Sequence, residues 1–150
     1  MAEITTQAPA KTPWHVWVVG GVSLLWNAMG AMDFTLTETR SEAYLKNFTP
    51  AQLKYFMEFP LWVVVAWGIA TWGSVAGSLL LMLRRGWAVQ VNLAVIVGMA
   101  LTFVYNFILT DGLKAMGGGA GSMAFTAAIV VIGVLLFLYA RAMHRRGVLR

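Results

Sequence analysis

Long apolar runs separated by short polar stretches dominate the chain. Residues 59–83 and residues 87–110 contain no Asp, Glu, Lys, Arg or His, and only Arg84, Arg85 and Gly86 lie between them. Each run is longer than the roughly 20 residues that an α-helix needs to cross a hydrocarbon core about 30 Å thick. Because so short a link brings the second helix back beside the first, the pattern predicts a transmembrane helical hairpin with a paired-arginine tip.

Two further apolar runs, residues 14–32 and residues 122–140, flank this hairpin. A cleaved signal peptide is the alternative for the first of them. Its length and its three tryptophans favour a retained helix, and no convincing small-x-small cleavage site follows it. We therefore expect an all-α polytopic membrane protein whose four transmembrane helices form an antiparallel up-down bundle, with spans at about residues 14–32, 59–83, 87–110 and 122–140.

The polar connection of residues 33–58 carries a signal for a further helix. Thr49-Pro50-Ala51-Gln52 is a capping-box pattern with proline at the first helical position. Leu53, Phe56 and Met57 then fall on one face at helical spacing. This predicts a short amphipathic helix at the membrane surface in the first outer loop, and an ordinary extramembrane loop is the alternative.

Composition agrees with a membrane protein. Hydrophobic residues make up 59% of the chain and charged residues 11%, whereas a soluble domain carries about 25% charged residues. The absence of cysteine excludes disulfides and thiolate chemistry. The net charge of +5 resembles a nucleic-acid signal, but the cations cluster at the ends of apolar runs, as membrane topology requires. We expect membrane lipids as partners and no nucleic acid.

The distribution of Lys and Arg predicts an orientation. With four spans, the N-terminal tail (residues 1–13), the arginine tip and the basic C-terminal tail (residues 141–150) share one side of the membrane. That side has seven of the 11 Lys and Arg residues and one of the six acidic residues. The positive-inside rule then places both termini in the cytoplasm and the long polar connection outside.

Small residues predict how the helices pack, because close approach rather than apolar burial associates helices in lipid. Gly73 and Gly77 form a GxxxG pair in the second span, and Gly98 and Thr102 lie in the third. Since GxxxG is frequent by chance in apolar sequence, we expect it to pack inside the monomer rather than in a dedicated dimer contact.

Polar residues in or near the spans are the candidates for a functional site. Asn27 must find hydrogen-bond partners within hydrocarbon, which points either to function or, more simply, to an interhelical hydrogen bond that fixes packing. Other polar residues fall near the outer interface, where they either line a vestibule for a cation, proton or sugar or merely end helices. The candidate vestibule comprises Asn27, Asp33, Glu58, Tyr105 and Asn106.

Basic residues and histidines are expected at the cytoplasmic boundary. His15 and His144 lie there rather than within the bilayer, so we expect no haem, chlorophyll or metal, and no enzyme motif is present. The arginines form a basic rim that would contact anionic lipid head groups. These candidate lipid contacts are Arg84, Arg85, Arg141, Arg145 and Arg146.

The chain resembles a family of small four-helix bacterial inner-membrane proteins whose members are commonly labelled sugar transporters. The resemblance covers most of the chain between Trp14 and Arg146. It rests on Leu25-Trp26-Asn27 with Gly30 and Asp33, on Phe59-Pro60-x-Trp62, and on Gly73, Gly77 and Leu79-Leu80-Leu81 before Arg84-Arg85-x-x-Ala88. It implies a bacterial inner-membrane location and a small-solute, sugar-like transporter.

Two functions from different classes remain open at this point. A carrier, which would have to be a homo-oligomer because four helices enclose little space, predicts a water-accessible cavity that reaches Asn27, Asp33, Glu58 and Asn106. A non-catalytic accessory subunit or assembly factor of a larger membrane complex predicts a filled core and an apolar outer face.

Overall fold

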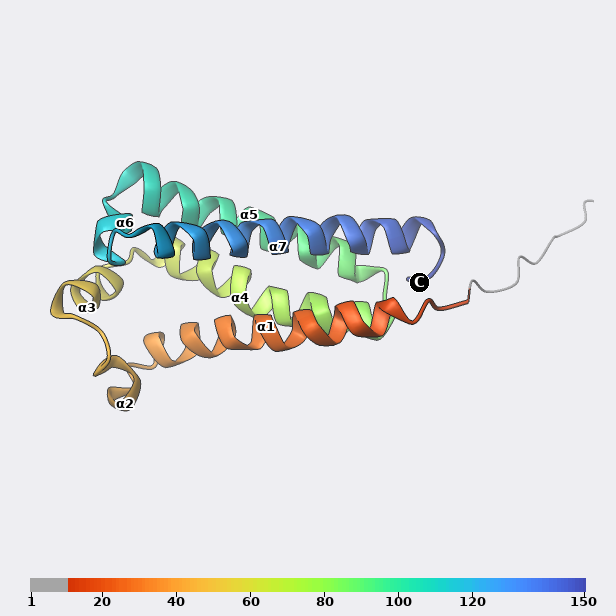
Figure 1. Cartoon of the computed structure of the whole chain (residues 1–150), viewed down its shortest axis with the longest axis horizontal. Coiled ribbons are helices and arrows are strands. Elements are labelled where there is room, and N and C mark those ends of the chain that lie inside the picture. The colour runs from red at the N-terminus through yellow and green to blue at the C-terminus, as the bar shows by residue number, and fades with distance from the viewer. Residues whose placement is uncertain (1–10) are drawn as a thin grey trace, which may run out of the picture.

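The computed structural model describes residues 11–150, and all regular secondary structure in this part of the chain is helical. Figure 1 shows the long helices lying lengthwise against one another, with short helices gathered at one end. The helices are α1 (His15–Glu38), α2 (Glu42–Leu45), α3 (Pro50–Met57), α4 (Leu61–Met82), α5 (Trp87–Val104), η1 (Tyr105–Leu109), α6 (Gly112–Ala115) and α7 (Ala120–Arg145). Residues 1–10 of the expected N-terminal tail lie outside the described residues.

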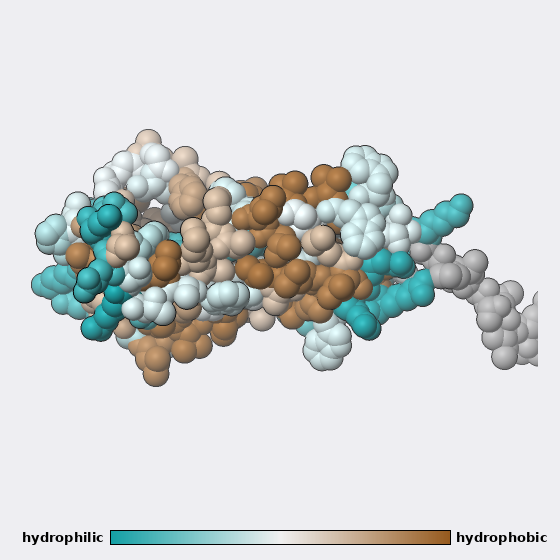
Figure 2. Space-filling view, turned by 90° about the horizontal axis from the view of Figure 1, so that it is seen from below, coloured by the Kyte–Doolittle hydropathy of each residue, from teal (hydrophilic) through white to brown (hydrophobic). Residues whose placement is uncertain are grey.

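Three of these helices are long and apolar enough to cross a membrane. They are α4, the continuous helix formed by α5 and η1, and α7, with 22, 23 and 26 residues. Figure 2 shows mainly apolar and weakly polar residues along the middle of the molecule and hydrophilic residues gathered at its two ends. At 24 residues α1 is equally long, but its tryptophans, glycines, Asn27 and Asp33 lower its hydropathy, and it is not among the three.

Helix α1 extends beyond the span expected at residues 14–32 and ends at Glu38. Aromatic contacts with α4 hold its last two turns. The rings of Phe34 and Trp67 meet edge to face with their centres 5.0 Å apart, and the Trp72 indole donates a hydrogen bond to Thr35 Oγ1 over 3.2 Å. Asp33 is therefore a helical residue rather than the start of a loop.

Helices α4 and α5 make the most extensive contact between two helices of residues 11–150, and glycine makes it possible. A Cβ atom added at Gly98 would lie 2.6 Å from the carbonyl oxygen of Ala66. One added at Gly77 would lie 2.7 Å from the Asn92 amide nitrogen, and one at Gly73 would lie 2.9 Å from Val95. The GxxxG pair thus packs against α5 of the same chain, as the sequence predicts.

The C-terminal segment, residues 141–150, consists of the end of helix α7 and a turn that folds back onto the long helices. Helix α7 continues to Arg145, and Gly147, in the left-handed region at φ 69°, then reverses the chain. This turn buries Val148 and Leu149, each 2% exposed, among apolar residues of α1, α4 and α5. Two backbone hydrogen bonds hold the end of the chain against the α4–α5 link, Arg150 N to Arg84 O (2.9 Å) and Gly86 N to Arg150 O (2.7 Å).

The short surface helix expected after Thr49 is α3, and both halves of its capping box are present. The Thr49 hydroxyl accepts from Gln52 N over 3.3 Å, and the Gln52 side chain accepts from Thr49 N over 2.9 Å. Local sequence therefore fixes where this helix begins.

Replacement of Gly98 by alanine is expected to lower the free energy of unfolding by about 1–3 kcal/mol, the usual cost of overpacking. The added methyl group would displace backbone of α4 rather than a flexible side chain. Titration with sodium dodecyl sulfate in detergent micelles, followed by circular dichroism, measures the change.

Gly21→Ala is the matched control, because a Cβ at Gly21 meets nothing within 4 Å. We expect this variant to be as stable as the wild type or slightly more stable. Equal losses in the two variants would contradict the close α4–α5 contact.

Candidate functional site

A cluster of polar side chains joins α1 and α4 inside the helical layer. Asn27 Nδ2 donates to Ser78 Oγ over 3.0 Å and to the Ser74 carbonyl over 3.2 Å. Ser23 Oγ donates to Ser78 Oγ over 3.1 Å. All four residues are buried. Asn27 thus makes the interhelical hydrogen bonds that the simpler interpretation of its position expected.

The buried polar side chains of this cluster all have hydrogen-bond partners within the protein. No buried side-chain nitrogen or oxygen among residues 11–150 lacks a hydrogen-bond partner. Burial of an amide without hydrogen-bond partners in hydrocarbon would cost several kcal/mol. The hydrogen bonds from Asn27 to Ser74 and Ser78 of α4 therefore stabilise its buried position. The arrangement fixes the register of α1 against α4.

Asp33 accepts a hydrogen bond from a residue of the polar connection between α1 and α4. The Tyr44 hydroxyl of α2 donates a hydrogen bond to Asp33 Oδ1. Burial, this hydrogen bond and the nearby carboxylate charge raise the pKa of Tyr44 to about 12. The contact anchors α2 to the end of α1, and Asp33 faces α2 rather than a shared vestibule.

A polar pocket of about 430 Å³ lies at the end of the molecule formed by α3, η1 and α6. Glu58 and Tyr105 line it, together with Tyr55, Thr110 and Asp111. The rest of its lining consists of Ala51, Lys54, Lys114 and Ala115. Lys54 lies 3.9 Å from Glu58 and Lys114 lies 3.6 Å from Asp111, both as exposed pairs, which are worth little in stability.

Tyr55 organises the wall of this pocket. Its hydroxyl donates to Asn106 Oδ1 over 2.7 Å and lies 2.9 Å from Thr110 Oγ1. Burial raises the pKa of this phenol. Asn106 and Thr110 face Tyr55 because α5 widens into the π-helical turn η1, a local feature that is frequent at functional sites.

The structure therefore divides the five candidate vestibule residues among three places. Glu58 and Tyr105 line the polar pocket, and Asn106 adjoins it through Tyr55. Asp33 pairs with Tyr44, and Asn27 lies in the α1–α4 interface. The role of Tyr55 is not predicted from the sequence, because a tyrosine between Lys54 and Phe56 on a short helix carries no signal of a bond to α5.

Aromatic rings surround Tyr55 and attach α3 to the long helices. Phe59 contacts Tyr55, Trp67 and Tyr105, with ring centres 5.1, 6.0 and 5.3 Å apart. Trp62 meets Tyr105 edge to face at 5.6 Å. This aromatic cluster closes the helical layer beneath the pocket.

The five candidate lipid-contact arginines gather at the opposite end of the molecule, where α7 and the α4–α5 link meet (Figure 1). Arg84 has a left-handed backbone, with φ 57°, and its Nε donates to the Val148 carbonyl over 3.3 Å. The other four are exposed: Arg85, Arg141, Arg145 and Arg146. Arg84 thus secures the C-terminal segment, whereas the others face outward.

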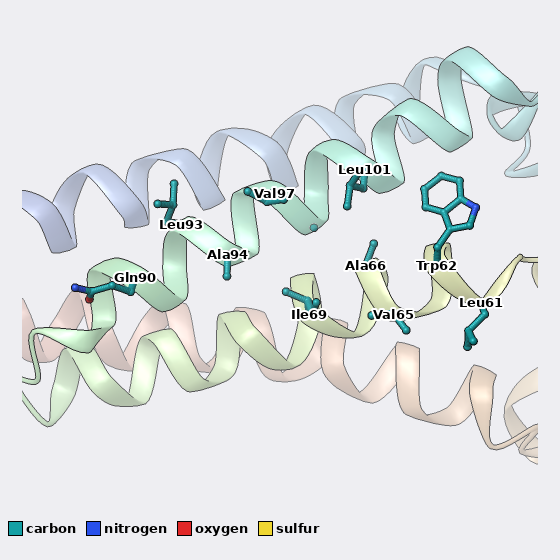
Figure 3. A pocket seen from close by; sticks show the side chains of 11 residues that line it. Leu61, Trp62, Val65, Ala66, Ile69, Gln90, Leu93, Ala94, Val97 and Leu101 are labelled. Carbon is teal, nitrogen blue, oxygen red and sulfur yellow. The ribbon is translucent and has the colours of Figure 1, made fainter.

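An apolar groove of about 1000 Å³ runs along the outer surface between α4 and α5. Figure 3 shows the side chains of α4 and α5 that line it, with Gln90 at one extremity and Leu61 at the other. Its remaining lining residues are Trp62, Val65, Ala66, Ile69, Leu93, Ala94, Val97, Gly98 and Leu101. This groove is not predicted from the sequence, because its shape depends on how α4 and α5 cross.

The two histidines each contact another part of the chain. Within residues 11–150, no group of three or more His, Cys, Asp or Glu residues is placed to hold a metal ion. His15 Nδ1 is hydrogen-bonded to the Tyr139 hydroxyl, and His144 lies against Gly86. Both rings thus contact neighbouring helices of the same chain.

Comparison with known proteins gives no guide to the site: no family model, no curated protein and no solved structure matches this chain.

The raised pKa of Tyr44 predicts a loss of stability in alkali. The folded protein holds this phenolic proton more tightly than the unfolded chain, whose tyrosine pKa is 10.0. Its contribution to stability is therefore complete below pH 10 and is lost as the pH rises through about 12. We expect wild type to be more stable than Tyr44→Phe at pH 8, and the difference to shrink as the pH approaches 12.

Denaturant unfolding of both proteins at several pH values measures this difference in the free energy of unfolding. The ionisation of groups that both proteins share cancels in the difference. A difference that stays constant from pH 8 to pH 12 would show that the Tyr44–Asp33 contact does not form in the folded protein.

Proposed function

We propose that the chain is a bacterial inner-membrane protein that spans the membrane four times, with both termini in the cytoplasm. Three helices with the length and hydropathy of membrane spans support this placement. The fourth span is α1, which lies along α4 and shares a buried hydrogen-bond cluster with it. The arginine-rich end then faces the cytoplasm by the positive-inside rule, and the resemblance to small inner-membrane proteins supports the location.

We further propose that the protein is a non-catalytic accessory subunit or assembly factor of a larger membrane complex. The observation that carries this proposal is the closed polar interior. Asn27, Ser23, Ser74 and Ser78 bond to one another or to backbone, and no buried polar side chain of residues 11–150 is left unpaired. A carrier needs polar groups that can exchange their partners for a solute, and here these groups fix helix packing instead.

A small-solute, sugar-like carrier is the second candidate, and the outer polar pocket favours it. Its lining combines an aromatic ring, Tyr105, with the carboxylates Glu58 and Asp111. Such a pocket suits a sugar, and the resemblance to a family labelled sugar transporters points the same way. The pocket, however, shares no residue with the Asn27 cluster, so it does not supply a path across the helical layer.

The accessory role predicts how the protein behaves on purification. Extracted from native membranes in a mild detergent, it should migrate on a native gel in a complex of defined stoichiometry with another membrane protein. Proteoliposomes that contain the purified chain alone should accumulate a radiolabelled sugar no faster than empty vesicles. Mass spectrometry of the gel band and a filter-binding uptake assay provide the two measurements.

Variants of the pocket separate the two candidates. The test variant is Glu58→Gln, and the control is Glu42→Gln, which makes the same change on α2 at a residue that does not line the pocket. Uptake above that of empty vesicles that is lost in Glu58→Gln but kept in Glu42→Gln would overturn the accessory role in favour of a carrier.

A further inference from the structure

The apolar groove between α4 and α5 has a floor and walls. Ala66 and Gly98 are buried at its floor, where the two helices touch. Larger side chains rise on both sides, among them Ile69 of α4 and Leu93 and Val97 of α5, which are 44%, 49% and 53% exposed. A groove of this shape accepts a narrow apolar group.

The groove is at least as long as one leaflet of a bilayer. It follows α5 from Gln90 to Leu101, about 16 Å at 1.5 Å per residue, and continues along α4 to Leu61. One leaflet contributes about half of a hydrocarbon core roughly 30 Å thick. A partner transmembrane helix is about 10–12 Å wide with its side chains, so a groove whose floor is the contact between two helices fits an acyl chain better than a helix.

The end of the groove at Gln90 lies close to positive charge. Arg85 lies two residues before α5 begins at Trp87, and Gln90 lies in the first turn of that helix. The Arg85 side chain is exposed, whereas that of Arg84 is engaged with the Val148 carbonyl. Gln90 is also exposed, and its amide can donate to an ester or phosphate oxygen.

Acidic residues are concentrated at the other end of the molecule. Asp33 lies near the end of α1 that meets α2, Glu58 and Asp111 line the polar pocket, and Glu38 and Glu42 flank the turn between α1 and α2. The two ion pairs of residues 11–150 are both at that end. The arginine-rich end therefore keeps a net positive charge, which attracts an anion.

We propose that an anionic phospholipid binds in this groove, with an acyl chain between α4 and α5 and its phosphate at Arg85 and Gln90. The positive charge of Arg85 complements the phosphate, and the apolar lining of the groove complements the acyl chain. The proposal rests on the membrane placement given above, and it holds for an accessory subunit and for a carrier alike. It narrows the general contact between a basic rim and lipid head groups to one defined site.

Native mass spectrometry of the full-length protein in detergent tests the proposal. Phosphatidylglycerol and phosphatidylcholine with identical acyl chains are titrated separately, so that only the head-group charge differs. We expect saturable binding of one phosphatidylglycerol, several-fold tighter than that of phosphatidylcholine. Equal affinities for the two lipids would overturn the proposal.

Head-group variants test the charged end of the site. Arg85→Gln should weaken the binding of phosphatidylglycerol about fivefold, the effect of one basic residue near an anionic surface, and should leave phosphatidylcholine unchanged. Lys114→Gln is the control, because it removes one positive charge at the far end of the molecule. Equal effects of the two substitutions would show that net charge alone governs binding.

Groove variants test the apolar part. Ala94 is exposed and lines the groove, so Ala94→Trp should fill it and abolish saturable binding of the lipid. Ala100→Trp places the same side chain on α5 at an exposed residue that does not line the groove, and it should bind lipid like the wild type. Circular dichroism checks that both variants keep their helices. Lipid binding that persists in Ala94→Trp would overturn the proposed binding site. This result does not depend on whether the protein is an accessory subunit or a carrier.

Discussion

The structure depends on the contact between α4 and α5, where the two backbones meet at Gly98 and side chains of α5 pack onto Gly73 and Gly77 of α4. At Gly98 any larger residue would meet the carbonyl oxygen of Ala66, and at Gly77 it would meet Asn92. Close approach of this kind is what associates helices in lipid, where apolar burial provides no driving force. Because only a short link joins the two helices, their packing also sets the positions of the elements at either end.

The consequences of this contact reach both ends of the molecule. At one end, α4 and the start of α5 frame the apolar site into which Val148 and Leu149 turn, and Arg84 fixes that turn through its side chain and its backbone. At the other end, α5 widens into η1, which presents Asn106 to Tyr55. Between them the helices meet at small residues, which leaves a long groove on their outer side. The α4–α5 contact thus forms the floor of the apolar groove and holds the elements that bury the C-terminal turn at one end and present Asn106 at the other.

Features that depend on local sequence could be predicted, and features that depend on distant contacts could not. The apolar runs, the capping box at Thr49 and the intramolecular packing of Gly77 follow from composition, hydrogen-bond geometry and residue size. The pairing of Asp33 with Tyr44 and of Tyr55 with Asn106 could not be foreseen, because each joins elements whose relative placement only tertiary packing decides. The fold-back of the C-terminal segment could not be foreseen for the same reason, because Val148 and Leu149 pack against residues of distant helices.

An engineered disulfide tests the central contact most directly, and the absence of native cysteine makes the experiment clean. The atoms nearest to a Cβ at Gly77 all belong to Asn92, so cysteines at these two positions approach the Cβ separation of about 3.5–4.5 Å that a disulfide requires. In native membranes with a mild oxidant, Gly77→Cys/Asn92→Cys should form an intramolecular disulfide, detected by mass spectrometry of the linked peptides, whereas Gly21→Cys/Asn92→Cys should not. Failure of the first pair to cross-link, or a disulfide-linked dimer of Gly77→Cys alone, would contradict the account.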